Sequence, residues 1–208
     1  YVSIFCSINV YLRAIGCQQE HCRSKGPSNM NLHFKMFDRR NTAPEELSKL
    51  WKLAKIMRRH VFVRELEVAE EKEFDDHDGF SRHIISFIGD APISYARWRV
   101  VEETGSTFAL IERWCTLHRH RNLTFAKQLL RATIRDISSV RSTLSAIVTT
   151  CPNQPVPLRV VESIGFKQIG RQFEKGGRVF QRLILSRPFL RSSLALEEHK
   201  SGTTNGPF

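Results

Sequence analysis

The sequence contains no uninterrupted run of the ~18 apolar residues that a membrane-spanning helix requires. It has only five cysteines, an odd number without paired spacing, so neither a disulfide framework nor a zinc site is expected. We therefore expect a protein of a reducing compartment, the cytoplasm, with no membrane partner and no metal. The composition, 41% hydrophobic and 25% charged over 208 residues, is typical of one globular domain.

The chain carries a formal net charge of +11, which raises the question of a polyanionic partner. Its Lys and Arg residues are scattered over different segments, and no recognition helix, RNA-binding sheet signature or zinc-finger spacing accompanies them. The pattern therefore favours a basic surface that serves an anionic cofactor. A nucleic-acid partner is kept as an alternative.

The sequence pattern divides the chain into three parts. Residues 1–29 lack sustained periodicity, and we expect them to be extraneous or disordered, with the native start at Met30. Residues 30–186 carry the periodic patterns of a folded domain. Residues 187–208 are polar and contain glycine, so a disordered tail is expected there.

A first helix is expected to begin at Thr42. Thr42 and Glu45 have the spacing of a capping box, and Pro44 falls in the first turn, where its missing N–H is tolerated. Apolar residues then recur at helical spacing as far as Met57. The acidic segment Glu65–Asp78 follows, and it is interpreted either as a solvated loop or as a loop that faces substrate and attracts an amine.

Three strands in meander order are expected next, because hydrophobic runs alternate with glycine-containing turns. Amphipathic and β-branched patterns then alternate toward the end of the domain. This order predicts an α/β (α+β) fold with a mixed, mostly antiparallel central sheet flanked by helices. The expected strands are 83–88, 93–101, 108–117, 144–150, 166–169 and 177–185, and the expected helices are 126–137 and 158–164.

The segment 111–130 runs from a strand through a short basic loop into a helix. The first turn of a helix offers main-chain amides that have no intrahelical partner, together with a partial positive charge. Arg119, Arg121 and Lys127 add full positive charges near the same place. The junction is therefore a candidate phosphate-binding site.

This segment resembles the acetyl-CoA motif of the GNAT acetyltransferases, in which a strand is followed by Arg/Gln-x-x-Gly-x-Gly/Ala and a helix. Arg121 matches the first residue of that motif and Ala126 the last, whereas Thr124 stands where the family has glycine and could crowd a pyrophosphate. Further matches follow in the order of the ElaA-like branch of the family. They are Arg59–Glu65, Glu73, Asp75, Asp78, His83, Tyr95–Arg97, Gln154, Glu162, Gly165-Phe166, Gly170 and Phe173–Gly177.

The resemblance implies a GNAT-like acyl-CoA N-acyltransferase fold and the transfer of an acetyl group from acetyl-CoA to a primary amine by direct attack. The acceptor would be a small molecule or a peptide. A base must remove the amine proton, and Glu112 and Glu65 are the candidates. The cofactor-binding residues that the resemblance implies are Cys115, Thr116, Leu117, Arg121, Asn122, Leu123, Thr124, Phe125, Ala126, Lys127 and Gln154.

One departure from the family concerns the acid that protonates the leaving thiolate. Val161 stands where a tyrosine is common, and Phe180 stands where a histidine is usual in the ElaA-like pattern. Either solvent or another group, such as Cys151 or Tyr95, supplies the proton, or the domain is a catalytically impaired coenzyme-binding or regulatory module. A basic nucleic-acid-associated protein is the third hypothesis, and the sequence leaves open whether the chain forms a homodimer.

Overall fold

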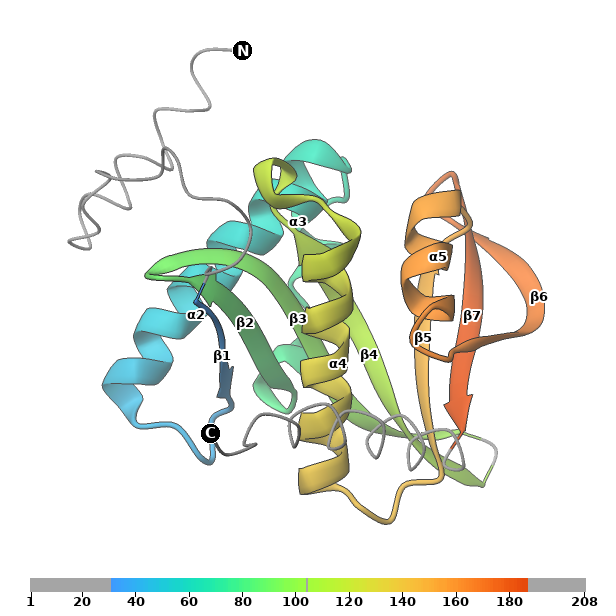
Figure 1. Cartoon of the computed structure of the whole chain (residues 1–208), viewed down its shortest axis with the longest axis horizontal. Helices are drawn as coiled ribbons and strands as arrows, with labels where there is room; N and C mark the ends of the chain where they lie inside the picture. The colour runs from blue at the N-terminus through green and yellow to red at the C-terminus, as the bar shows by residue number, and fades with distance from the viewer. Residues whose placement is uncertain (1–30, 104, 187–208) are drawn as a thin grey trace, which may run out of the picture.

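A computed structural model describes residues 31–103 and 105–186, so the expectations for residues 1–30 and 187–208 lie outside the described residues. The described chain forms one seven-stranded sheet with the order β1-β2-β3-β4-β5-β7-β6 (Figure 1). Strands β4 and β5 are parallel, and the other neighbouring pairs are antiparallel. The prediction of a mixed, mostly antiparallel sheet flanked by helices is confirmed.

The elements alternate along the chain much as the sequence patterns indicated. The strands are β1 (Leu32–Phe37), β2 (Arg82–Ile88), β3 (Ala91–Glu103), β4 (Ser106–Thr116), β5 (Ala146–Pro152), β6 (Lys167–Lys175) and β7 (Arg178–Ser186). The α-helices are α2 (Pro44–Arg58), α3 (Glu70–Glu73), α4 (Leu123–Val140) and α5 (Pro155–Glu162). A π-helix, η1 (Arg59–Glu65), and two 3-10 helices, η2 (Asp76–Gly79) and η3 (His118–His120), complete the described part.

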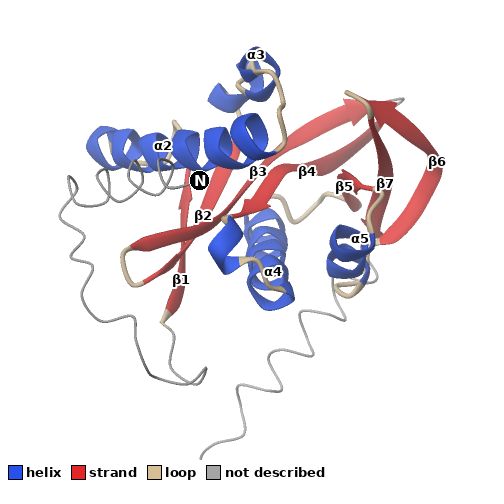
Figure 2. Ribbon diagram, turned by 90° about the horizontal axis from the view of Figure 1, so that it is seen from above, coloured by secondary structure: helices blue, strands red, loops and turns tan. Residues whose placement is uncertain are grey.

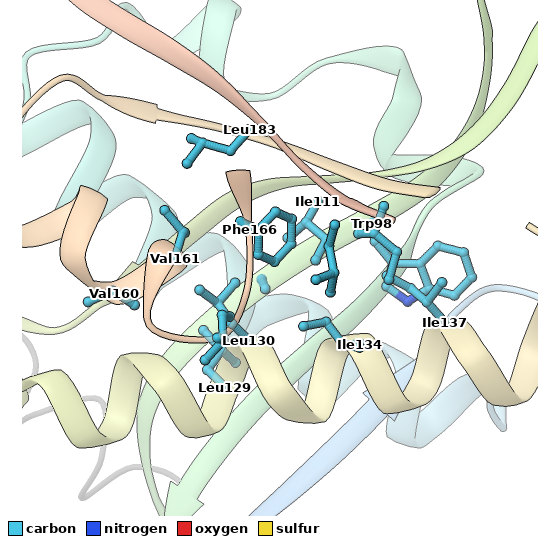
Figure 3. Close-up of a cluster of buried hydrophobic side chains, with 14 of the residues drawn as sticks. Trp98, Ile111, Leu129, Leu130, Ile134, Ile137, Val160, Val161, Phe166 and Leu183 are labelled. Carbon is cyan, nitrogen blue, oxygen red and sulfur yellow. The ribbon is translucent and has the colours of Figure 1, made fainter. Parts of the chain in front are cut away.

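Helices cover both faces of the sheet, with α2 and α3 on one face and α4 and α5 on the other (Figure 2). The helical repeat of apolar residues along α4 packs against the sheet, and α5 joins the same core through Val160 and Val161 (Figure 3). The second core lies under α2, where Leu50, Ala54 and Met57 meet the opposite face of the sheet. None of the described helices is both long enough and apolar enough to cross a bilayer.

Strand β1 was not among the expected elements. Its sequence, Leu-His-Phe-Lys-Met-Phe, alternates apolar and polar residues, which is the period of a half-buried strand. Among the strands of residues 31–103 and 105–186, it lies at the edge of the sheet and pairs only with β2. The alternation was therefore a usable signal, although a short edge strand gives few residues on which to read it.

The predicted capping box of the first helix is wrong. Helix α2 begins at Pro44, and its N-cap, Ala43, makes no side-chain capping bond. The hydroxyl of Thr42 instead accepts the amide of Asp38 at 3.2 Å, and the Asp38 carboxylate accepts the amides of Arg40 and Asn41 at 2.8 Å each. Thr42 thus closes the turn after β1, which leaves the helix to start at the proline.

The two interpretations of the acidic segment are also wrong for its buried members. The segment folds into α3 and η2, and Glu73 is only 1% exposed. Glu73 accepts the Arg58 Nε at 2.6 Å, and Asp75 and Asp78 accept the guanidinium of Arg97 at 2.5 and 2.6 Å. Because both arginines are fully buried, they require carboxylate partners, and the acidic segment supplies them.

Candidate active site

Strands β4 and β5 pair over only three residues, Ala109–Ile111 with Ile147–Thr149. The hydroxyl of the buried Thr149 donates to the carbonyl of Ile111 at 3.0 Å and so closes the last paired position. Beyond it, Figure 1 shows the two strands running apart. We call this divergence the fork; its arms are residues 112–116 of β4 and 150–152 of β5.

A β-bulge lies on the β4 arm of the fork. Between the pairs Tyr95–Cys115 and Arg97–Glu112, strand β4 advances three residues while β3 advances two. Arg113 has a positive φ of 55°, which is rare outside glycine. Its guanidinium holds the bulge by bonding the carbonyl of Lys72 at 2.9 Å and pairing with Glu73 at 3.0 Å.

The main chain after the bulge faces two directions. The amide of Leu117 donates to the carbonyl of Ile93 at 2.9 Å, so Cys115 and Leu117 face β3, and the alternation of a strand turns Thr116 toward the fork. Of the three predicted cofactor-binding residues here, Cys115 and Leu117 therefore turn their main chain to β3, and Thr116 remains the candidate for main-chain bonds to a ligand. Cys115 belongs to the core under α2, where burial raises the pKa of its thiol to about 12.

The N-terminus of α4 opens beside the β4 arm, but part of it is already occupied. Asn122 is the N-cap, and its side chain accepts the amide of Phe125 at 2.9 Å. This corrects the prediction that the Phe125 amide is available to a phosphate. The amides of Leu123 and Thr124 have no acceptor within the helix, and the first turn contains no acidic residue although the helix dipole favours one there.

Arg121, the residue that opens the predicted phosphate motif, is tied to the protein by both sides of its guanidinium. Its Nε donates to the carbonyl of Thr116 at 3.0 Å, and its Nη2 forms a very short bond with the carboxylate of Glu65. His60 holds the other carboxylate oxygen of Glu65 at 3.2 Å. We call the contacts among Glu65, Arg121 and His60 the latch.

The latch depends on the π-helix that continues α2. Residues 59–65 form a π-helix, in which amides bond carbonyls five residues earlier, and π-helical turns frequently mark functional positions. His60 and Glu65 come from this short element, and its end meets the loop before α4 through Arg121. Glu65, predicted as a base candidate, thus contacts the first residue of the predicted phosphate motif.

Glu112, the other base candidate, is the first β4 residue beyond the last paired position of the fork. Its side chain is 15% exposed. Its carboxylate accepts the Arg99 Nε at 2.7 Å and forms an ion pair with the Arg97 Nη2 at 3.0 Å. The structure therefore separates the two candidates: Glu112 is held at the fork, and Glu65 is held in the latch.

A buried polar network lies beneath the bulge and was not anticipated from the sequence. The hydroxyl of Tyr95 and the Nδ1 of His83 are 2.7 Å apart, and the Nε2 of His83 is 3.0 Å from the carbonyl of Asp78. Burial lowers the pKa of His83 to about 4 and raises the pKa of Tyr95. Together with the buried Arg58 and Arg97, these groups fix α3 and η2 against the sheet.

The alternative proton donors are too deeply buried for that role. Tyr95 and Cys151 are both fully buried, and burial raises the pKa of the Cys151 thiol to about 12. Val161, which replaces the family tyrosine, is also fully buried and packs in the core beneath α5. This part of the chain therefore offers no side-chain acid at the positions considered.

The remaining predicted cofactor residues lie at the same end of the sheet. Ala126 is buried in the first turns of α4, Lys127 follows it half-buried, and Gln154 is the exposed N-cap of α5 directly after β5. Within residues 31–103 and 105–186, no His, Cys, Asp and Glu side chains come together in a group that could hold a metal ion.

Comparison with known proteins identifies the fold. No family model matches the chain. A 66-residue stretch is 36% identical to the uncharacterized N-acetyltransferase YjcF of Bacillus subtilis (strain 168); it covers 32% of this chain and 44% of that relative. An acyl-CoA N-acyltransferase from Pseudomonas aeruginosa superposes with a TM-score of 0.59 at 14% identity, covering 74% of this chain and 99% of that one.

The branch of the family suggested by the motifs is represented as well. Escherichia coli ElaA superposes with a TM-score of 0.57 at 18% identity, covering 74% of this chain and 98% of its own. The match to YjcF spans less than half of that relative, and the structural matches are too low in identity to carry more than the fold. They do bear out the resemblance drawn from the motifs, and the chain has the GNAT acyl-CoA N-acyltransferase fold.

Proposed function

We propose that the protein is an N-acetyltransferase that takes its acetyl group from acetyl-CoA and transfers it to a primary amine. The observation that carries the proposal is the adjacency of two features: a forked pair of parallel strands and a helix N-terminus without acidic residues at the open end of that fork. A helix terminus of this kind binds phosphate groups, and an open strand arm can hold an extended chain by main-chain bonds.

The residues present fit the diphosphate of the coenzyme. Two amides of the first turn, those of Leu123 and Thr124, have no intrahelical acceptor. The side chain of Thr124 is exposed, and the group that would donate to a phosphate at this position is its main-chain amide. Lys127 lies within the next turn. Arg121 would turn its guanidinium from Glu65 to the phosphates, so that the latch opens when coenzyme binds.

The main chain of the β4 arm would hold the pantetheine. Thr116 faces the fork, and its carbonyl already accepts the Nε of Arg121. A chain lying along this arm from α4 toward the bulge brings its thioester near Glu112. The bulge held by Arg113 therefore sets the direction of the strand at the place where the reaction would occur.

Glu112 is our candidate for the base. Its carboxylate would accept a proton from the amine as the nitrogen attacks the acetyl carbonyl; an N–C bond forms, the C–S bond breaks, and the thiolate leaves with the coenzyme. Arg97 and Arg99 hold the carboxylate in place. Because the described side chains at the considered positions supply no acid, we propose that solvent protonates the thiolate.

The burial of Val161 favours one second candidate function, a coenzyme-binding module that does not turn over. A direct experiment distinguishes the two functions. Calorimetry with acetyl-CoA measures binding, and a thiol-release assay with a panel of primary amines measures transfer. Binding with release of thiol is the expected result, binding without release on any amine supports the module, and no binding refutes both.

A charge reversal in the phosphate motif tests where the coenzyme binds. Arg121→Glu should weaken acetyl-CoA at least tenfold, because it replaces a cation at two phosphates by an anion. Arg141→Glu is the matched control, since the same change is made at the other end of α4, ~27 Å away along an 18-residue helix. Equal affinity in the two folded variants would place the coenzyme elsewhere.

A further inference from the structure

One face of the sheet is covered by α4 and α5, and the proposed function puts the acceptor on the other face. The residues that pack against α4 and α5, such as Ile111, Ile147 and Leu183, lie on one face. Glu112 is the neighbour of Ile111 along β4, so its side chain lies on the opposite face. If the coenzyme enters beside α4, as the proposed function requires, the amine must approach Glu112 over that opposite face.

The strand registers extend this acceptor face to the last hairpin. Leu110, two residues before Glu112, pairs with Val148, which pairs with Ile184 on β7. Residues that oppose each other directly share a face, and so do residues two apart on a strand. The same face therefore carries the five residues that we call the hairpin face: Phe173, Lys175, Arg178, Phe180 and Arg182.

The hairpin face lies at the open end of the fork. Figure 1 shows the β6–β7 turn at the same end of the molecule as the start of α4, and Figure 2 shows α2 and α3 over the other half of this face. Among the described residues, no helix packs on this face of β6 and β7. The registers put Arg182 at the level of Glu112, and the tip of the hairpin face lies four residues farther toward the open end of the fork.

The part of the chain that contains the hairpin is strongly basic. Residues 31–117 contain 14 basic and 15 acidic residues, whereas residues 118–186 contain 12 basic and 3 acidic ones. One of the three, Asp136, is buried and accepts bonds from Arg82 and Trp98. The carboxylates Glu73, Asp75 and Asp78 are also committed to arginines, so they are not free to attract a cationic amine.

A like-charged pair at the tip of the hairpin points to an anionic ligand independently of the overall charge. Lys175 and Arg178 oppose each other directly across the two-residue turn of Gly176 and Gly177, both of which have positive φ. Directly opposed residues lie about 5 Å apart, and like charges in that position are destabilising. A bound anion would remove the repulsion.

The apolar part of the face lies next to this pair. The rings of Phe173 and Phe180 stack with centroids 5.9 Å apart, and Phe173 remains 40% exposed. Phe180 is also the position at which the sequence departs from the histidine usual in its family. An aromatic platform followed by two cations suits a ligand with an apolar stem and an anionic end.

We infer that the acceptor amine carries carboxylate groups separated from its amino group by a short stem, and that Lys175 and Arg178 bind them while Phe173 and Phe180 support the stem. This inference rests on the proposed function, because the acceptor face is defined by the fork and Glu112. Two sources share this chemistry, the N-terminus of an acidic peptide and a free dicarboxylic amino acid. The assay separates them by size.

The test compares acetyl transfer from acetyl-CoA to matched acceptors. Three peptides differ only in two residues after the N-terminal one, which are Glu-Glu, Gln-Gln or Lys-Lys, and free glutamate is compared with free glutamine. We expect kcat/KM to be about tenfold higher for the acidic peptide than for the neutral one, because two exposed ion pairs contribute modestly each. Added salt should reduce the preference. Preference for the acidic peptide alone identifies a peptide acceptor, and preference for glutamate alone a small molecule.

Charge reversal at the hairpin locates the effect. In Lys175→Glu/Arg178→Glu the preference should disappear or reverse, while the KM for acetyl-CoA stays unchanged. Arg40→Glu/Lys52→Glu makes the same change of net charge at two exposed positions, one before α2 and one in its middle, and should keep the preference. Equal kcat/KM for acidic and neutral acceptors would overturn the inference but leave the proposed function standing.

A binding measurement keeps the inference testable if transfer itself fails. Fluorescence anisotropy with labelled acidic and neutral peptides, on protein saturated with coenzyme A, reports the same preference without turnover. If no amine is acetylated and the acidic peptide still binds more tightly, the proposed reaction fails and the anionic ligand stands. If both peptides bind equally, the anionic ligand is refuted as well.

Discussion

Replacing Glu65 by glutamine is expected to tighten the binding of coenzyme A by about fivefold. In the structure, the Glu65 carboxylate holds Arg121 and is itself held by His60. The side chains of Arg121 and Glu65 are 43% and 24% exposed, so their ion pair contributes about 1 kcal/mol after screening by solvent. Coenzyme binding must break this ion pair before Arg121 can bind the phosphates. Removing the Glu65 charge therefore makes the free energy of binding more favourable by the same amount.

Calorimetric titration with coenzyme A, at low and at high salt, measures the effect. The gain should shrink at high salt, since the competing pair is partly exposed. Glu71→Gln is the matched control, because Glu71 is exposed on α3, in the same acidic segment, and should leave the affinity unchanged. A Glu65→Gln variant that folds normally but binds coenzyme more weakly, or equally well, would show that the latch does not compete with phosphate.

The same variant also decides between the two base candidates. If Glu112 takes the amine proton, Glu65→Gln should keep kcat within a few-fold of the parent protein. A loss of 100-fold or more is the size expected for removal of a general base. Such a loss at Glu65 would return that residue to the catalytic role and leave Glu112 as a structural partner of its two arginines.

Three further outcomes are expected. Glu112→Gln should lower kcat by ~10²–10⁴-fold with the affinity for acetyl-CoA unchanged, measured by thiol release and calorimetry; a small change in kcat would contradict its assignment as base. Asn122→Ala removes the cap of α4 and should lower the melting temperature by about 3 °C in a domain of this size. Coenzyme should restore part of that loss by binding the freed Phe125 amide, and a loss of equal size with and without coenzyme would argue against a phosphate at this turn. Below pH 6.5 the unfolded chain takes up a proton at His83 that the folded protein resists until about pH 4, because burial lowers its pKa. The free energy of unfolding should therefore fall by about 3 kcal/mol as the pH falls from 6.5 to 4, and chemical denaturation should show a flatter profile in His83→Gln but not in the exposed control His77→Gln.

The fold was largely readable from the sequence because its signals are local and periodic. The apolar repeat of α4 and the turn at Gly89 both correspond to observed elements. The start of α2 was misplaced because a capping box is defined by spacing, and Thr42 has two possible partners within four residues. The turn that Asp38 forms with Arg40 and Asn41 decided between them.

The candidate site was predicted in its residue types but not in its contacts. Arg121, Glu65 and Glu112 were all singled out, yet the sequence could not show that the first two meet across 56 positions of the chain. Asn122, by contrast, is a residue type that often caps helices, so its local bond to the Phe125 amide could have been expected and was missed. Hydrogen-bond partners far apart in sequence are set by packing, and a pattern of spacings carries no information about them.

By itself, the sequence determined the order of most strands and helices, the basic character of the second half and the position of the predicted phosphate motif before α4, since each follows from neighbouring residues. The tertiary structure decided what the charges do. Arg58 and Arg97 are buried, so the carboxylates of the acidic segment pair with them and do not face a substrate. It also decided that β4 and β5 part after three residue pairs and that a bulge at Arg113, of the kind that bends a strand, follows directly after the last pair.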